Sequence, residues 1–255
     1  MNLFGNKKIV VDYYVYTNKG DREINEDSCN VFSQNDMYCC VLCDGLGGHD
    51  KGEVASQTVL KIFEDGFKMH QLKDNSKAFL ENSFNIGQEE LIKEQKIQRN
   101  RFGMKTTAVS LLIKKQKVIW GHVGDSRLYA FKNNEVKIRT KDHSVPQVLC
   151  NAGDIKESDI RFHPDRNKLI RVMGATWEKP MYEISEEKKI KHFNAFLLCT
   201  DGFWELITEE EMCGLLKESS TPKVWIENMV KVIEKVGDNK NKDNFSAIGV
   251  FINGQ

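Results

Sequence analysis

Apolar positions along the chain follow two periodicities, one typical of strands and one typical of helices. Alternation of apolar and polar residues, clearest in residues 106–113, predicts strands, whereas apolar residues three and four positions apart predict helices. The expected strands are residues 10–17, 28–33, 37–44, 106–113, 117–123, 126–132, 135–139, 181–185, 195–200 and 245–252. The expected helices are residues 52–69, 77–98, 209–217 and 222–236. Because hairpin-length connections join the strands between residues 106 and 139, antiparallel pairing is favoured, and the pattern predicts an α+β fold with helices outside the sheets.

One stretch, residues 140–180, shows neither the strand nor the helix periodicity. It is rich in charged residues and turn formers, among them Pro146, Gly153, Pro164 and Gly174. A long irregular segment in a compact protein usually serves a function or is mobile. The rest of the chain shows no internal repeat, low-complexity segment or linker, so residues 1–255 are expected to form a single domain.

Carboxylates stand at the ends of four expected strands. The four clusters are Glu26-Asp27, Asp44, Asp201 and Asp243. Asp44 ends a short apolar run, and three of the next four residues are glycines, which let the backbone turn sharply and approach a ligand. Such an aspartate can bind a hard cation, and the carbonyl after it can join as a second ligand. Because no set of Cys and His ligands competes, the clusters predict one oxygen-lined site for several cations, with magnesium or manganese favoured over zinc.

The overall composition excludes several other kinds of protein. A chain of 255 residues, 40% hydrophobic and 29% charged, is ordinary for a soluble globular protein with one core. Its formal net charge of zero gives no indication of a nucleic-acid or membrane partner. The apolar runs are too short to span a bilayer and the first residues lack a signal-peptide core, so a cytoplasmic location is expected. Seven scattered cysteines fit a reducing compartment, and Cys40 and Cys43, which point to opposite faces of an expected strand, are interpreted as core residues.

Eight motifs, in order along nearly the whole chain, resemble those of the metal-dependent serine/threonine phosphatases of type 2C in their compact bacterial form. They are R-E-I-N-E-D (22–27), D-G-L-G-G-H-D-K-G-E-V-A-S (44–56), G-M-K-T-T (103–107), V-G-D-S-R-L-Y (123–129), D-H-S (142–144), L-I-R-V-M-G (169–174), C-T-D-G-F-W (199–204) and D-N-F-S (243–246). The resemblance implies two stacked antiparallel sheets flanked by helices on both outer faces, with metals in a cleft at one end. It also implies a flap beside the site, from about residue 141 to residue 177.

The resemblance also implies a role for each carboxylate. Asp44 corresponds to the carboxylate that bridges two manganese or magnesium ions. Glu26 and the carbonyl of Gly45 correspond to ligands of one ion, and Asp201 and Asp243 to ligands of the other. A bridging carboxylate is needed because the two cations, about 3.5–4 Å apart, repel each other.

The sequence pattern alone leaves open the roles of three further residues. Asp125 reads by itself as a turn aspartate, whereas the resemblance implies that it shares a third, weaker metal with Asp201. Arg22 lies in a charged turn and matches the family's phosphate-binding arginine, whose planar fork suits two phosphate oxygens. Asp27 points away from Glu26 in an extended chain, which favours orienting a metal-bound water over direct binding. The acid that protonates the leaving group stays open, because Leu46 stands where eukaryotic relatives have a histidine.

The function implied by the resemblance is hydrolysis of phosphoserine and phosphothreonine by a water or hydroxide that bridges the two ions. The expected partners are phosphorylated proteins, substrates of a Ser/Thr kinase, and the protein is expected to be a monomer with neither nucleic acid nor membrane as partner. Two alternatives remain: a phosphatase of small phosphomonoesters, and a phosphoprotein-binding regulator with little activity. A dead regulator predicts lost ligands, but Glu26, Asp44, Asp201 and Asp243 are all present.

Overall fold

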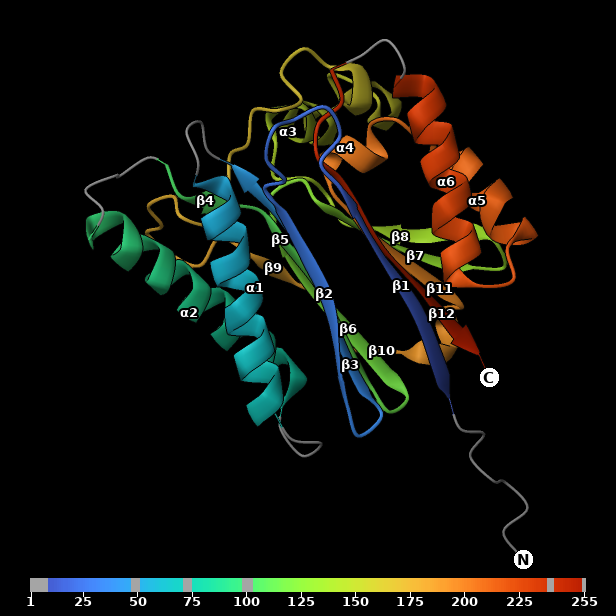
Figure 1. The fold of residues 1–255 in the computed structure, drawn as a ribbon, viewed down its shortest axis with the longest axis horizontal. Helices are drawn as coiled ribbons and strands as arrows, with labels where there is room; N and C mark the ends of the chain where they lie inside the picture. Colours follow the sequence, from blue (N-terminus) through green and yellow to red (C-terminus); the bar gives the residue numbers. More distant parts are fainter. Residues whose placement is uncertain (1–8, 47–50, 71–74, 98–102, 238–240, 254–255) are drawn as a thin grey trace, which may run out of the picture.

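The protein is a sandwich of two antiparallel β-sheets with helices on both outer faces (Figure 1). The computed structural model describes residues 9–46, 51–70, 75–97, 103–237 and 241–253. The helices are α1 (Gly52–Met69), α2 (Ser76–Ile97), α3 (Val145–Ala152), η1 (Glu157–Phe162), η2 (Ile190–His192), α4 (Asp201–Trp204), α5 (Glu209–Glu218) and α6 (Pro222–Gly237), with η1 and η2 of the 3-10 type. The α+β class and the stacked-sheet architecture expected from the sequence are confirmed.

The two sheets differ in the distance along the chain between paired strands. The five-stranded sheet has the order β1 (Val10–Asn18), β12 (Phe245–Asn253), β11 (Ala195–Cys199), β7 (Arg127–Lys132) and β8 (Glu135–Arg139). The seven-stranded sheet runs β10 (Lys188–Lys189), β6 (Lys117–Val123), β5 (Ala108–Lys114), β3 (Met37–Leu46) and β2 (Asp27–Gln34), with β4 (Lys105–Thr106) on β3 and β9 (Glu183–Ile184) on β6. The first strand thus pairs with the last, Val10 opposite Asn253.

Three apolar layers hold the sandwich together. The inner faces of both sheets meet in a core that includes Leu42, Leu128 and Ile248. Helices α1 and α2 cover the outer face of the seven-stranded sheet through residues such as Phe63, and α5 and α6 cover the five-stranded sheet through Trp225. Alternation along the strands explains this arrangement, because successive side chains point to the inner and the outer layer in turn.

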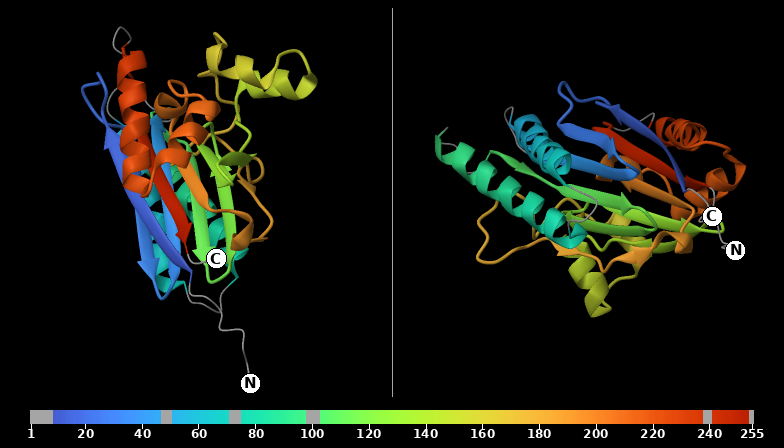
Figure 2. Two further views of the ribbon diagram at one scale, coloured as in Figure 1. Left: turned by 90° about the vertical axis from the view of Figure 1, so that its right-hand side faces the viewer. Right: turned by 90° about the horizontal axis from the view of Figure 1, so that it is seen from below.

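The segment around residues 140–180 is more regular than the sequence indicated. It contains α3 and η1, and Figure 2 shows this part, in yellow, projecting from the edge of the sandwich. Ser144 precedes α3, Pro146 lies in its first turn, and Gly153 ends it with a φ of 87°. Proline is tolerated in a first turn, where its missing N–H has no helical partner, and glycine adopts a positive φ without steric cost. The expectation of an irregular segment was therefore wrong for residues 145–152 and 157–162.

Two smaller expectations concern the cysteines and membranes. Cys43 packs under the α1 and α2 layer while Cys40 faces the core between the sheets, so the two point to opposite faces as expected. All seven cysteines are free. Among the described helices, none has the length and apolar character needed to cross a bilayer.

Strand register brings the carboxylate clusters to one end of the sandwich. Asp27, at the start of β2, lies directly opposite Asp44, near the end of β3. In the other sheet, the last turn before β12 and the first turn after β11 lie side by side, because Cys199 pairs with Ala247. Asp201 and Asp243, which flank these strands, therefore lie at the same end of this sheet.

Candidate active site

Five aspartates gather at the end of the sandwich. They are Asp27, Asp44, Asp125, Asp201 and Asp243. The carboxyl groups of Asp44 and Asp201 are close enough to share a hydrogen bond, which two ionised carboxylates cannot do without a proton or a cation between them. The sequence had placed all five at strand ends or in adjoining turns, and the fold brings them together.

The electrostatics of the cluster follow from burial and from mutual repulsion. Burial, followed by the charge of Asp201, raises the pKa of Asp27 to about 8. Burial and the nearby Glu205 and Asp243 raise the pKa of Asp201 to about 7. For Asp44 and Asp125 the same causes, burial first and Asp201 next, raise the pKa well above the usual range. Cations in contact with these groups would favour their ionised forms and relieve the repulsion.

Asp27 lies between the two sheets and is only partly satisfied. Its Oδ2 accepts hydrogen bonds from the hydroxyls of Ser246, at 2.7 Å, and Thr200, at 3.2 Å, both from the opposite sheet. Its Oδ1 is buried and has no hydrogen-bond partner within the described part of the chain. A buried acceptor of this kind is costly unless it meets a water or an ion.

Glu26 and Gly45 meet at the start of α1, where two glycines allow a close approach. The N–H of Gly45 donates to the Glu26 carbonyl at 3.1 Å, and the N–H of Gly52 donates to Glu26 Oε1 at 3.2 Å. A Cβ atom on Gly52 would lie 2.4 Å from that carboxylate oxygen, and one on Gly45 would lie 2.3 Å from the Gly52 carbonyl. Both positions therefore require glycine if Glu26 is to stay beside the Gly45 backbone. Residues 47–50 of this motif lie outside the described residues.

Arg22 lies beside the aspartates and borders an open cavity. Its Nη2 contacts Asp243 Oδ2 at 2.8 Å, and its side chain is about half exposed. The cavity, of about 580 Å³, is lined by Arg22, Asp201 and Asp243 together with Phe162, Arg166 and Glu205. This volume exceeds what a single phosphorylated side chain needs, so part of a larger substrate can enter.

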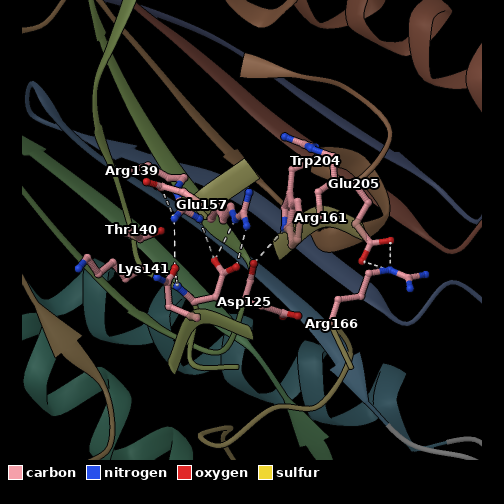
Figure 3. A network of polar contacts seen from close by, with 12 residues as sticks. Asp125, Arg139, Thr140, Lys141, Glu157, Arg161, Arg166, Trp204 and Glu205 are labelled. Carbon is pink, nitrogen blue, oxygen red and sulfur yellow. Dashed lines mark hydrogen bonds and ion pairs between the residues drawn. The ribbon is translucent and has the colours of Figure 1, made fainter. Parts of the chain in front are cut away.

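Asp125 is held by neighbours that the sequence did not point to (Figure 3). The indole N–H of Trp204 donates to the Asp125 carbonyl at 3.0 Å. Next to this contact, Arg166 and Glu205 form an ion pair at 2.8 Å. Glu205 stands four residues after Asp201, one helical turn away, and that spacing was the only signal for it in the sequence.

A second group of possible ligands lies nearby. His122, His143 and Glu183 each offer one ligand atom, all within 4.8 Å of one another. However, Nδ1 of His143 accepts a hydrogen bond from the Gly124 N–H, so the neutral ring carries its proton on Nε2, which faces Glu183 at 3.2 Å. Burial and the adjacent His122 lower the pKa of His143 to about 4, so this ring is neutral at physiological pH and braces the root of the flap.

Comparison with known proteins agrees with this geometry. The family model described as protein phosphatase 2C matches residues 17–241. The serine/threonine phosphatase Stp of Listeria welshimeri is 30% identical over 200 residues, covering 77% of this chain and 79% of the relative. The chain belongs to the protein phosphatase 2C family.

Solved phosphatases of the 2C family share the fold. The crystal structure of the serine/threonine phosphatase Stp1 from Staphylococcus aureus superposes with a TM-score of 0.86 at 28% identity and covers 100% of both chains. The catalytic domain of PstP, in complex with two manganese ions, has the same fold, with a TM-score of 0.78 at 23% identity over 96% of this chain and 99% of that one. The chain is a serine/threonine protein phosphatase.

Proposed function

We propose that the protein hydrolyses phosphoserine and phosphothreonine in proteins with the help of two magnesium or manganese ions bound at the end of the sandwich. The observation that carries this proposal is the meeting of five carboxyl groups from both sheets beside a cavity that Arg22 lines. Two of these groups are in hydrogen-bond contact and one has a buried, unpartnered oxygen among the described residues. Such a set is costly on its own and suits hard cations, which prefer oxygen ligands.

The ligands divide between two tight ions. Asp44 would contact both, with Glu26 and the Gly45 carbonyl completing one site and Asp201 and Asp243 the other. Every donor is an oxygen, which favours magnesium or manganese over zinc. The two manganese ions described for the PstP domain, which shares the fold, are in keeping with this choice.

A third, weaker ion would lie between Asp125 and Asp201. The two carboxyls lie near each other, because the charge of Asp201 contributes to the raised pKa of Asp125. Asp125 is not needed by the two tight sites. The carbonyl of Asp125 accepts a hydrogen bond from Trp204, and the side chain of Asp125 is the group that would bind the cation.

The chain's own residues bind and orient the reactants. When bound, the cations would neutralise the phosphate charge and lower the pKa of a coordinated water. Arg22 would exchange its contact with Asp243 for two phosphate oxygens, which its planar fork can hold together. Asp27 would accept a hydrogen bond from the attacking water at Oδ1, and the hydroxyls of Ser246 and Thr200 keep that carboxyl in place.

The flap, residues 141–177, would select the protein substrate. It contributes Phe162 and Arg166 to the wall of the cavity that Arg22 also lines, and Phe162 is 78% exposed. An exposed aromatic side chain at the rim of a substrate cavity is suited to contact a residue next to the phosphorylated one. The substrates would be the products of a Ser/Thr kinase.

Turnover of a panel of phosphothreonine peptides and of small aryl phosphates, with and without manganese or magnesium, tests the proposal. We expect higher kcat/KM for the peptides, and loss of both activities after chelation and dialysis. Equal kcat/KM for the two substrate classes would support a phosphatase of small phosphomonoesters, and binding without turnover would support a regulator. Full activity after thorough removal of metals would overturn the metal mechanism.

A further inference from the structure

Trp204 connects the two carboxylates assigned to the weak cation. It is the last residue of the one-turn helix α4, whose first residue is Asp201. Hydrogen bonds from Phe203 and Trp204 to the Thr200 carbonyl, both at 3.1 Å, fix this turn. Trp204 is therefore rigidly joined to Asp201 through the backbone and to the turn of Asp125 through its indole N–H, at 3.0 Å.

The plane of the Trp204 ring is set by a buried arginine. The guanidinium carbon of Arg127 lies 3.4 Å from the ring centroid, which is a close cation–π contact. Arg127 in turn forms a two-pronged ion pair with Asp142, with Nε to Oδ1 at 2.8 Å and Nη2 to Oδ2 at 2.7 Å. Both members of the pair are buried, so the ring is held against a rigid partner.

A second arginine, from the flap, completes the surroundings of the ring. Arg161 lies on η1 with its guanidinium carbon 5.6 Å from the Trp204 ring centroid (Figure 3). It donates to the Ile207 carbonyl and to Glu209 Oε2, each at 2.8 Å. These contacts support the indole in the orientation in which its N–H points at the Asp125 carbonyl.

We infer that Trp204 is a positioning residue that sets the spacing of Asp125 and Asp201 and thereby the affinity of the third cation. The inference rests on the third cation of the proposed function. Two carboxylates that repel each other separate unless their backbones are tied, and a cation between them then binds more weakly. The indole hydrogen bond joins the strand-end turn of one sheet to the helix that follows a strand of the other.

The simpler role for a buried tryptophan is packing, and the chain contains a matched control for it. Trp225 is also buried, and its N–H also donates to a backbone carbonyl, that of Met212, at 3.0 Å. Trp225 lies on α6 in the apolar layer outside the five-stranded sheet. Trp204→Phe and Trp225→Phe therefore remove the same kind of hydrogen bond while each keeps an aromatic ring.

Manganese binding to the metal-stripped protein, measured by calorimetry and by electron paramagnetic resonance of free manganese, tests the inference. We expect Trp204→Phe to raise the dissociation constant of the weakest class of sites about fivefold, in keeping with one lost buried hydrogen bond. The tight classes should change less, and the manganese concentration for half-maximal activity should rise in parallel. Trp225→Phe should lower the melting temperature without moving the weakest dissociation constant.

The outcomes separate the inference from the proposal beneath it. If the parent protein binds a third ion that Asp125→Ala removes, and Trp204→Phe binds that ion as tightly as the parent, Trp204 only packs and the inference is overturned. An equal shift in Trp204→Phe and Trp225→Phe overturns it as well, because the effect is then general destabilisation. If the parent binds only two ions, the third cation fails and the inference fails with it.

Discussion

At the scale of single residues, the site buries aspartates at a free-energy cost that the proposed cations would offset. Four aspartates have raised pKa values because burial and like charge disfavour their ionised forms. The fold keeps them together through neutral donors, such as the hydroxyl of Ser246 on Asp27, rather than through arginines. The ion pair between Arg22 and Asp243 brings a positive charge to the cluster, and the Arg22 side chain is half exposed. The remaining negative charge of the cluster is thus left for metal cations to balance.

Replacing the proposed bridging carboxylate tests this balance most directly. Asp44→Asn keeps the shape of the side chain but removes one negative charge, so we expect both tight cations to bind more weakly. Because metals contribute several kcal/mol to the transition state, turnover should fall about a thousandfold or more. Asp12→Asn, at an exposed position of β1, is the control and should retain full turnover. Near-parental turnover of Asp44→Asn at saturating manganese contradicts the bridging role.

Arg22 is expected to act on binding more than on the chemical step. Arg22→Ala removes the fork that would hold two phosphate oxygens, and we expect KM for a phosphothreonine peptide to rise about tenfold with a smaller fall in kcat. Arg22→Lys keeps the positive charge without the planar fork, and its KM should lie between that of the parent and that of Arg22→Ala. Steady-state kinetics separates the two constants. A fall in kcat alone would assign Arg22 to the transition state instead.

At the scale of elements, the parts foreseen from the sequence were those with a repeating pattern. Alternation gave the position of β5, and helical spacing gave α1 and α6, because their buried faces recur over many residues. Helix α4 has four residues and strand β10 two, too few for any period to appear, and the strand expected at residues 181–185 is only two residues long, β9. Helix α3 was missed because Pro146 was read as a turn former rather than as a first-turn residue.

The site was foreseen to a similar extent and for a similar reason. Its aspartates stand in short motifs that mark strand ends, and the fold brings them together. The partners that hold them, Trp204 on Asp125 and Ser246 on Asp27, lie 79 and 219 residues away along the chain. No local pattern encodes a contact across such a separation, so these partners required the structure.

The start of α1 offers a test at this scale, with a control in the same helix. A Cβ on Gly52 would meet Glu26 Oε1 at 2.4 Å, whereas a Cβ on Gly66 would make only ordinary contacts at 3.4 Å or more. Alanine favours helices over glycine by roughly 1 kcal/mol. We therefore expect Gly66→Ala to keep or raise the melting temperature, and Gly52→Ala to lower manganese affinity and turnover together. If Gly52→Ala behaves like Gly66→Ala, the close approach does not matter for Glu26.

The flap can be probed through its exposed aromatic side chain. Phe162→Ala should lower kcat/KM for a phosphoprotein about fivefold while leaving that for a small aryl phosphate within twofold, because only the larger substrate reaches the rim. Val148→Ala, at an exposed position on α3 away from the cavity lining, is the matched control. A proportional fall on both substrates with metals still bound would place the flap in the catalytic machinery.

At the scale of the whole molecule, the site joins the two sheets. Asp27 and Asp44 belong to the seven-stranded sheet, whereas Asp201 and Asp243 flank strands of the five-stranded one. Hydrogen bonds from Ser246 and Thr200 to Asp27 already cross this gap. Cations bound by carboxylates of both sheets would add a further link, so metal binding and folding stability should be coupled.

Metal removal should therefore lower the melting temperature. At a manganese concentration about a hundredfold above the dissociation constant, binding adds about 2.7 kcal/mol, or roughly 5–10 °C for a protein of this size. Scanning calorimetry of the chelated protein, with and without added manganese, measures the shift. The Asp44→Asn variant should show a much smaller one. An unchanged melting temperature in the parent would mean that the cations do not link the sheets.

The pairing of the first strand with the last has a consequence for synthesis on the ribosome. Arg22 and Asp243, 221 residues apart, come into contact only after all the residues between them have left the exit tunnel. Until β12 emerges, β1 has no strand of its own sheet to pair with, and an unpaired strand edge is prone to pair with other chains. Closing so long a loop also makes the step slow. The catalytic end is therefore assembled last. A nascent or prematurely terminated chain that lacks β12 is expected to have no phosphatase activity.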